Sequence, residues 1–103
     1  MKVYISGPVT GTTDYTERFA RAAAFLQNHG FDVINPVAIM APLPESTTWR
    51  ECMAVSLALL TQADAIYSLR GWRGSEGAVV ERKVAEALGL EILDLIDETK
   101  VET

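Results

Sequence analysis

The sequence predicts a small doubly wound α/β fold of the flavodoxin or Rossmann kind, in which a parallel sheet of about four strands carries helices on both faces. Short apolar runs alternate with amphipathic segments along the chain, an order typical of parallel strand–helix–strand units. The chain has 103 residues, of which 49% are hydrophobic, enough to fill one compact core. We therefore assign residues 1–95 to a single domain and residues 96–103 to a flexible tail.

The first part of the chain carries two predicted strands separated by a helix. The strand Val3–Ile5 ends in the turn-rich segment SGPVTGTTD. A helix is expected from about Asp14 to His29, because its apolar residues recur at i, i+4, i+7, i+8 and i+11. Asp14 and Glu17 resemble a capping box at its start, and Gly30 is placed to end it. The segment FDVIN follows as the second strand.

The second part of the chain opens on a long loop, PVAIMAPLPEST, which contains three prolines. Loops of this length often act as lids or binding loops. Thr48 and Glu51 resemble another capping box, at the start of a helix that runs to about Gln62. The segment DAIYSL is the third predicted strand, the helix after it covers about 74–90, and EILDL is the fourth strand.

The helix over residues 74–90 has one carboxylate in the middle of its apolar face. Successive residues of a helix are about 100° apart around its axis. On this spacing Glu81 lies at the centre of a stripe along the helix, and within roughly 60° of that stripe lie apolar and small residues: Gly77, Ala78, Val84, Ala85 and Leu88. Burying a carboxylate costs several kcal/mol unless it is compensated. Either Glu81 pairs with an arginine such as Arg70 or Arg73, or it lines a ligand crevice that stays wet until a substrate binds.

Two Gly-rich turns are expected at the same edge of the sheet, SGPVTG after the first strand and RGWRGSEG after the third. Parallel sheets of this kind bind ligands beyond the carboxyl ends of their strands, where the strand order reverses. The turns should therefore converge on one crevice, which Glu81 would face. The spacing in SGPVTG matches neither a dinucleotide fingerprint nor a P-loop, but its free N–H groups beside a helix start could hold a phosphate.

The helix over residues 48–62 is apolar over an arc of roughly 200°, much wider than the stripe of a helix that packs on one side. Such a helix is expected to bury a second side against another copy of the chain. We therefore predict a homodimer or a larger homo-oligomer. Ser56 lies in the middle of this arc as a second polar residue that points inward.

The composition excludes several classes of function. A net charge of −5 without a basic patch counts against a nucleic-acid polymer as partner. No apolar run approaches the ~20 residues that span a bilayer, so no membrane association is expected. One histidine and one cysteine cannot build a zinc site of the usual ligand count, so no metal is expected. The single cysteine favours a reducing compartment, and we expect a cytoplasmic protein.

Three segments resemble the nucleoside 2-deoxyribosyltransferase superfamily, which includes the 2′-deoxynucleoside 5′-monophosphate N-glycosidases. They are YISG at the end of the first strand, AD at the start of the third, and SEGAVVE at the start of the helix after it. The full-length pattern, with NP, W…M and GW..S.GA..E, is most similar to a small uncharacterised branch. The resemblance extends from Tyr4 to Leu93, and its most specific part is S-x-G-x-x-x-E, here Ser75, Gly77 and Glu81.

The resemblance implies a role for each matching residue. Glu81 matches the catalytic glutamate that attacks the anomeric carbon, and Tyr4 matches the tyrosine that orients it. Ser75 matches a serine that helps to bind the 5′-phosphate in the N-glycosidase branch. The remaining candidates for substrate binding are Ser6, Gly7 and Gly11 in the first turn, Ser56, and Gly77. The implied chemistry needs no organic cofactor and no metal.

Ser56 departs from the superfamily pattern, because an aspartate eight residues before the AD is expected there. Serine offers one hydrogen bond where a carboxylate would also supply charge. The leading hypothesis is cleavage or transfer at the N-glycosidic bond of a nucleoside or, as the candidate phosphate contacts favour, a nucleoside 5′-monophosphate. The alternatives are a non-catalytic nucleotide-binding or sensor module and a purely structural oligomer.

Overall fold

The computed structural model describes residues 1–93, and its centre is a four-stranded, fully parallel sheet. The strand order is β2-β1-β3-β4. The chain adds β2 on one side of β1 and then crosses to add β3 and β4 on the other side, so the strand order reverses between β1 and β3. The strands are β1 (Lys2–Ser6), β2 (Asp32–Ile34), β3 (Ala65–Ser68) and β4 (Glu91–Ile92). The predicted fold class is confirmed, including the switch point beside the first strand.

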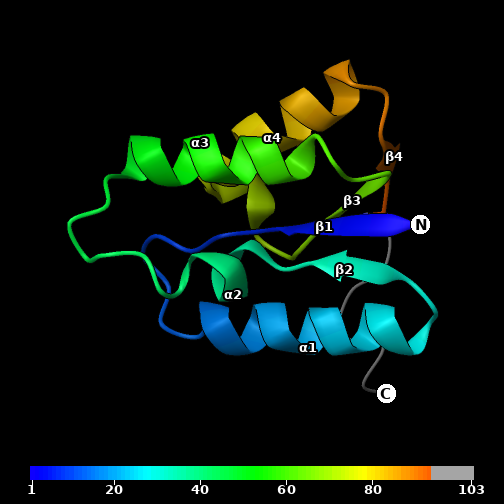
Figure 1. Cartoon of the computed structure of the whole chain (residues 1–103), viewed down its shortest axis with the longest axis horizontal. Helices are drawn as coiled ribbons and strands as arrows, with labels where there is room; N and C mark the ends of the chain where they lie inside the picture. The colour runs from blue at the N-terminus through cyan, green and yellow to red at the C-terminus, as the bar shows by residue number, and fades with distance from the viewer. Residues whose placement is uncertain (94–103) are drawn as a thin grey trace.

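Helices cover both faces of this sheet (Figure 1). One face carries α1 (Tyr15–Asn28), and the opposite face carries α3 (Trp49–Leu60) and α4 (Glu76–Ala87). Each face has its own hydrophobic core: Phe19 and Leu26 of α1 pack on the first, and Leu60 and Ala85 pack on the second. Successive side chains of β1 enter one core and then the other.

Successive side chains of β1 point to opposite faces of the sheet, as in any strand. Val3 and Ile5 belong to the core under α1, whereas Tyr4 belongs to the core under α3 and α4. Ser6, two residues after Tyr4, is therefore on the α4 side as well, and it is buried. The fold thus directs two hydroxyl groups of one strand toward α4.

Local end signals explain where most helices start and stop. Thr48 and Glu51 form the predicted capping box of α3 in both directions. Gly30 ends α1 with φ of 87°, and the N–H groups of Gly30 and Phe31 bond back to the last turn, as in a Schellman motif. Asp14 precedes α1 without a side-chain capping bond, so the capping box predicted there is wrong.

The segment predicted as a loop after β2 begins with a short helix, α2 (Pro36–Met40). The Asn35 side chain accepts hydrogen bonds from the N–H groups of Val37 and Ala38, and proline at the first helical position lacks the N–H that would go unpaired. These capping signals lie inside the segment NPVA, which was assigned to a strand end and a loop. The prediction of a loop over all of residues 36–47 is therefore wrong.

The last helix also differs in detail from its prediction. A 3₁₀ turn (Trp72–Gly74) precedes it, so α4 begins at Glu76 rather than near Gly74. Ala78, Glu81 and Ala85 are buried on its inner face, as the periodicity predicts. Leu88, which the periodicity placed on the same face, is the C-cap of α4 and is 51% exposed, so its predicted place on the inner face is wrong.

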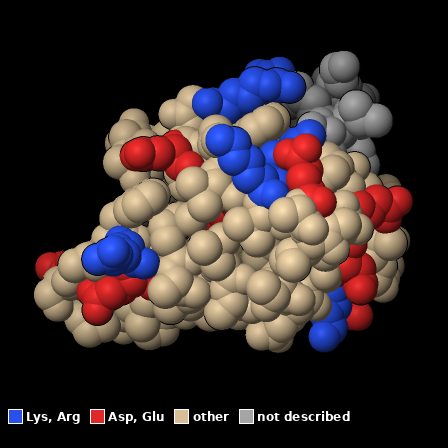
Figure 2. Space-filling view, turned by 90° about the horizontal axis from the view of Figure 1, so that it is seen from above, with Lys and Arg blue, Asp and Glu red and all other residues tan. Residues whose placement is uncertain are grey.

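Some predictions lie partly outside the described residues. The predicted fourth strand extends to residue 95, and the predicted tail covers 96–103; only Glu91–Ile92 of these is described as strand. The assignment of residues 1–95 to one domain stays a prediction. No helix within residues 1–93 is both long and apolar enough to cross a membrane. On the face that carries α3 and α4, acidic and basic side chains are interspersed among uncharged ones (Figure 2).

Candidate functional site

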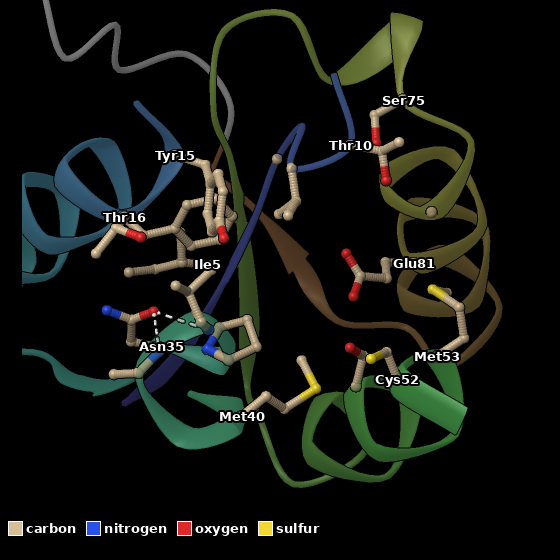
Figure 3. A pocket seen from close by; sticks show the side chains of 18 of the residues that line it. Ile5, Thr10, Tyr15, Thr16, Asn35, Met40, Cys52, Met53, Ser75 and Glu81 are labelled. Atoms are coloured by element: carbon tan, nitrogen blue, oxygen red, sulfur yellow. Dashed lines mark hydrogen bonds between the residues drawn. The ribbon is translucent and has the colours of Figure 1, made fainter. Parts of the chain in front are cut away.

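A cavity of about 1070 Å³ opens at the carboxyl end of β1. Residues of α1 and α2 line one side of it, and residues of α3 and α4 line the other. Figure 3 shows Glu81 reaching from α4 toward β1, with Cys52 and Met53 of α3 below it and Tyr15 and Asn35 across the cavity. The cavity lies at the switch point, where ligands of doubly wound folds bind.

Glu81 is the buried ionisable residue of this cavity. It lies in the second turn of α4 and is 7% exposed. The Tyr4 hydroxyl donates a hydrogen bond to Oε2 at 2.5 Å, and the Ser6 hydroxyl donates one to Oε1 at 2.7 Å. Each carboxylate oxygen therefore has its own donor from β1, which fixes the plane of the group. The structure thus brings together Tyr4, Ser6 and Glu81, which the sequence separates by up to 77 positions.

Burial and hydrogen bonding have opposite effects on the pKa of Glu81. Burial raises the pKa of the Glu81 carboxyl above 4.5, while hydrogen bonds from Tyr4, Ser6 and Ser56 act in the opposite direction. Burial and the neighbouring Glu81 charge raise the pKa of the Tyr4 hydroxyl far above its usual range, so this hydroxyl remains a donor. A carboxylate with fixed donors and reduced hydration is suited to act as a nucleophile.

An ion pair with arginine does not explain the burial of Glu81. Both hydrogen-bond partners that the structure gives its carboxylate are hydroxyl groups. The guanidinium groups of Arg73 and Arg82 lie over the ring of Trp72 instead, at 4.7 and 4.6 Å from its centroid. Of the two explanations that the sequence left open, the crevice is the one consistent with these contacts.

Ser56 is the predicted inward-facing residue of α3. It is buried, 5% exposed, and lines the cavity, and hydrogen bonding by its side chain acts to lower the pKa of both Glu81 and Tyr4. A third hydroxyl is therefore directed at the same carboxylate. A neutral hydroxyl at this position adds no second charge beside Glu81, as an aspartate there would.

The start of α4 forms one end of the cavity. Ser75 is the N-cap of α4, and its side-chain oxygen accepts a hydrogen bond from the N–H of Ala78 at 3.3 Å. A Cβ at Gly77 would lie 3.2 Å from the Met53 sulfur and 3.7 Å from the Trp49 indole nitrogen, so glycine allows α4 to approach α3 closely. Both Ser75 and Gly77 line the cavity, and their roles in substrate binding stay predictions.

The turn after β1 contributes unevenly to the cavity. Gly7 lines it, and a Cβ there would lie only 2.8 Å from that of Leu69, so glycine is required where this turn crosses the end of β3. Gly11 adopts φ of 83° in an exposed part of the same loop and does not line the cavity, whereas its neighbour Thr10 does. Ser6 does not line the cavity itself, but its hydroxyl donates a hydrogen bond to Glu81, which does.

Several cavity residues were missed by sequence reasoning or given another role. Tyr15, at the start of α1, and Asn35, directly after β2, both line the cavity. Trp49 and Cys52, in the first turn of α3, line it as well. The apolar face of α1 could not reveal that its first turn extends beyond the sheet edge. Within the described chain, no group of three or more His, Cys, Asp or Glu could hold a metal ion.

The parallel sheet and the cavity at its switch point define a Rossmann-like α/β protein with a buried glutamate at its strand ends. A family model described as a domain of unknown function (DUF4406) matches residues 1–94, and the chain belongs to that family. The structure is similar to that of a 2-deoxyribosyltransferase from the psychrotolerant bacterium Bacillus psychrosaccharolyticus, with a TM-score of 0.71 and 18% identity, covering 89% of this chain and 69% of that one. This likeness confirms the fold that the sequence resemblance implies. Comparison with curated proteins gave no match.

Replacing the buried acid should make the protein more stable at neutral pH. Because the native pKa of Glu81 is raised above 4.5, the folded protein binds more protons than the unfolded chain between 4.5 and that raised pKa, and the unfolding free energy falls as the pH rises through this interval. Glu81→Gln removes the titration, while its amide can still pair with Tyr4 and Ser6. We expect a gain of about 0.5–2 kcal/mol at neutral pH.

The measurement is the thermal midpoint of wild type and Glu81→Gln from pH 4 to pH 8. The difference in Tm should grow with pH to several degrees. Glu86→Gln is the matched control, since Glu86 lies on the same helix and its side chain is 61% exposed. A difference that is constant over this pH range, or a less stable Glu81→Gln protein, would contradict the assignment of a raised pKa.

Proposed function

We propose that the chain cleaves or transfers the N-glycosidic bond of a nucleoside or nucleoside 5′-monophosphate, with Glu81 as the nucleophile. The observation that carries the proposal is the buried carboxylate of Glu81, held by the hydroxyls of Tyr4 and Ser6 at the wall of a large cavity. The sequence resemblance and the fold shared with a 2-deoxyribosyltransferase support it.

In the first step, a Glu81 oxygen attacks the anomeric carbon as the bond from that carbon to the base nitrogen breaks, and the bonding pair leaves with the base. The Tyr4 and Ser6 hydroxyls keep the carboxylate in one plane, so little reorganisation is needed on the way to the transition state. In the second step, water or a second base attacks the same carbon and releases Glu81, and over the two steps the proton that this acceptor loses balances the proton that the departed base gains. A hydrolase and a transferase differ only in this second acceptor.

Ser56 supports a second candidate, a nucleotide-binding or sensor module without catalysis. The superfamily pattern has an aspartate where this chain has Ser56, and the residue is buried at the cavity wall beside Glu81. A serine hydroxyl can make a single hydrogen bond to a sugar hydroxyl, but it supplies neither the second acceptor oxygen nor the negative charge of a carboxylate. A module of this kind would bind the ligand in the same cavity and leave the glycosidic bond intact.

We also propose that the chain forms a homodimer or larger homo-oligomer through α3. Trp49, at the start of this helix, is 52% exposed and lines the mouth of the cavity. Leu43 and Ile39, in the preceding segment, are exposed apolar residues as well. A second copy of the chain would cover this surface, which borders the proposed binding site.

The purified protein should release free base from at least one member of a panel of nucleosides and 5′-monophosphates, followed by chromatography. Glu81→Gln should reduce the release by about a thousandfold or more, because it removes the nucleophile while keeping the shape of the side chain. Glu86→Gln should behave as wild type. Binding of a nucleotide by the wild type without any release would favour the sensor module, and absence of binding would contradict both.

Ser6→Ala should shift the pH dependence of the reaction. The Ser6 hydrogen bond lowers the pKa of Glu81, so its loss raises this pKa further, and the acid limb of kcat/KM moves to higher pH. Hydrogen bonds to charged groups are worth about 1.5–3 kcal/mol, so kcat at neutral pH should fall roughly 10- to 100-fold. Ser68→Ala is the control: Ser68 is buried and pairs with Ser6 in register, but its hydroxyl contacts Arg82. Equal effects of the two substitutions would contradict the assignment.

Light scattering at micromolar concentration should give a mass of at least two chains. Trp49→Ser should shift the equilibrium toward the monomer, since it removes the largest exposed apolar side chain of α3. A monomeric mass for the wild-type protein would contradict the proposed oligomer and would not bear on the proposed reaction.

A further inference from the structure

The charged residues that line the cavity within the described chain are both acidic. They are Glu76 and Glu81, and the cavity wall otherwise consists of polar uncharged, small and apolar residues. The whole protein carries a formal net charge of −5, which adds to the negative potential. A ligand with a negative group would therefore meet like charge inside the cavity.

Glu76 stands at the place where the sequence motif suggests a phosphate. It is the first residue of α4, between Ser75 and Gly77, and all three line the cavity. Its carboxylate already complements the positive end of the α4 dipole. The Ser75 side-chain oxygen accepts a hydrogen bond from the N–H of Ala78, which satisfies one of the N–H groups at this helix end. The Ser75 cap and the Glu76 carboxylate thus already offset part of the positive potential at this helix end.

The arginines near this helix end are directed to another surface. Arg73 and Arg82 lie over the ring of Trp72, and Arg82 also donates a hydrogen bond to the Ser68 hydroxyl. Neither arginine lines the cavity. Among residues 1–93, the cavity lining therefore has an acid at the start of α4 and no lysine or arginine beside it.

We propose that Glu76 is a specificity-determining residue that selects nucleosides over their 5′-monophosphates. The proposal rests on the proposed function of the cavity, and it names the substrate class. Glu76 is five positions before Glu81, about 7.5 Å along the helix axis, and it is an exposed residue in the lining of the same cavity. A 5′-hydroxyl can donate a hydrogen bond to a carboxylate. A 5′-phosphate, with a charge of about −1.5 to −2 near neutral pH, cannot donate in this way and is repelled.

The test compares each nucleoside with its own 5′-monophosphate. Wild type should favour the nucleoside in kcat/KM by about tenfold, and Glu76→Gln should narrow this ratio by about five- to tenfold, as expected for charges a few ångströms apart near solvent. High salt should narrow the ratio of the wild type, because it screens the repulsion. Glu86→Gln makes the same change in net charge on the same helix, outside the cavity, and should leave the ratio unchanged.

The same pairs are measured as dissociation constants with the Glu81→Gln protein, which needs no turnover. Tighter binding of the nucleoside, with no base released by the wild type from either ligand, would support selection by Glu76 while the proposed catalysis fails. A preference for the monophosphate, or a ratio that Glu76→Gln leaves unchanged, would overturn the inference even if the enzyme is active. Absence of binding by either ligand would overturn the inference and the proposed function together.

Discussion

The hydrogen bonds between β1 and the Glu81 carboxylate are the interaction on which the candidate site depends. A carboxylate that is 7% exposed is costly unless both of its oxygens have donors, and Tyr4 and Ser6 supply them. The strand that forms the centre of the sheet thus also determines where the acid points. Burial of this carboxylate raises the free energy of the folded state, and the same burial reduces its hydration, which the proposed nucleophilic role of Glu81 would require.

The cavity adds shape and charge to this central pair. Its walls come from helices on both faces of the sheet, so no single element contains the site. Glycines at two positions let backbones approach: Gly7 beside Leu69, and Gly77 beside Met53. Glu76 and Glu81 give the interior a negative character, which bears on the ligands that can enter. Fold, cavity shape and charge therefore each restrict which ligands the cavity could accept.

Much of this arrangement was predictable from the sequence, and the reasons for the failures are physical. The buried position of Glu81 follows from helical periodicity, and the capping box of α3 follows from Thr48 and Glu51. The helix α2 was missed because prolines around it suggested a loop, although Asn35 and Pro36 are typical of a helix start. The role of Ser6 as a donor to Glu81 was not predicted, because it depends on the distance between β1 and α4, which local patterns do not determine.

The spacing of Tyr4 and Ser6 links the pairing of the sheet to the chemistry of the site. Both hydroxyls point toward α4 because Tyr4 and Ser6 are two positions apart on a strand that pairs in register with β2 and β3. If β1 slipped by one position, Ile5 would face the acid and both oxygens would turn away beneath α1. A misaligned molecule would then carry a buried, unsolvated anion against a methyl surface. The buried carboxylate of Glu81 therefore destabilises the shifted register relative to the correct one.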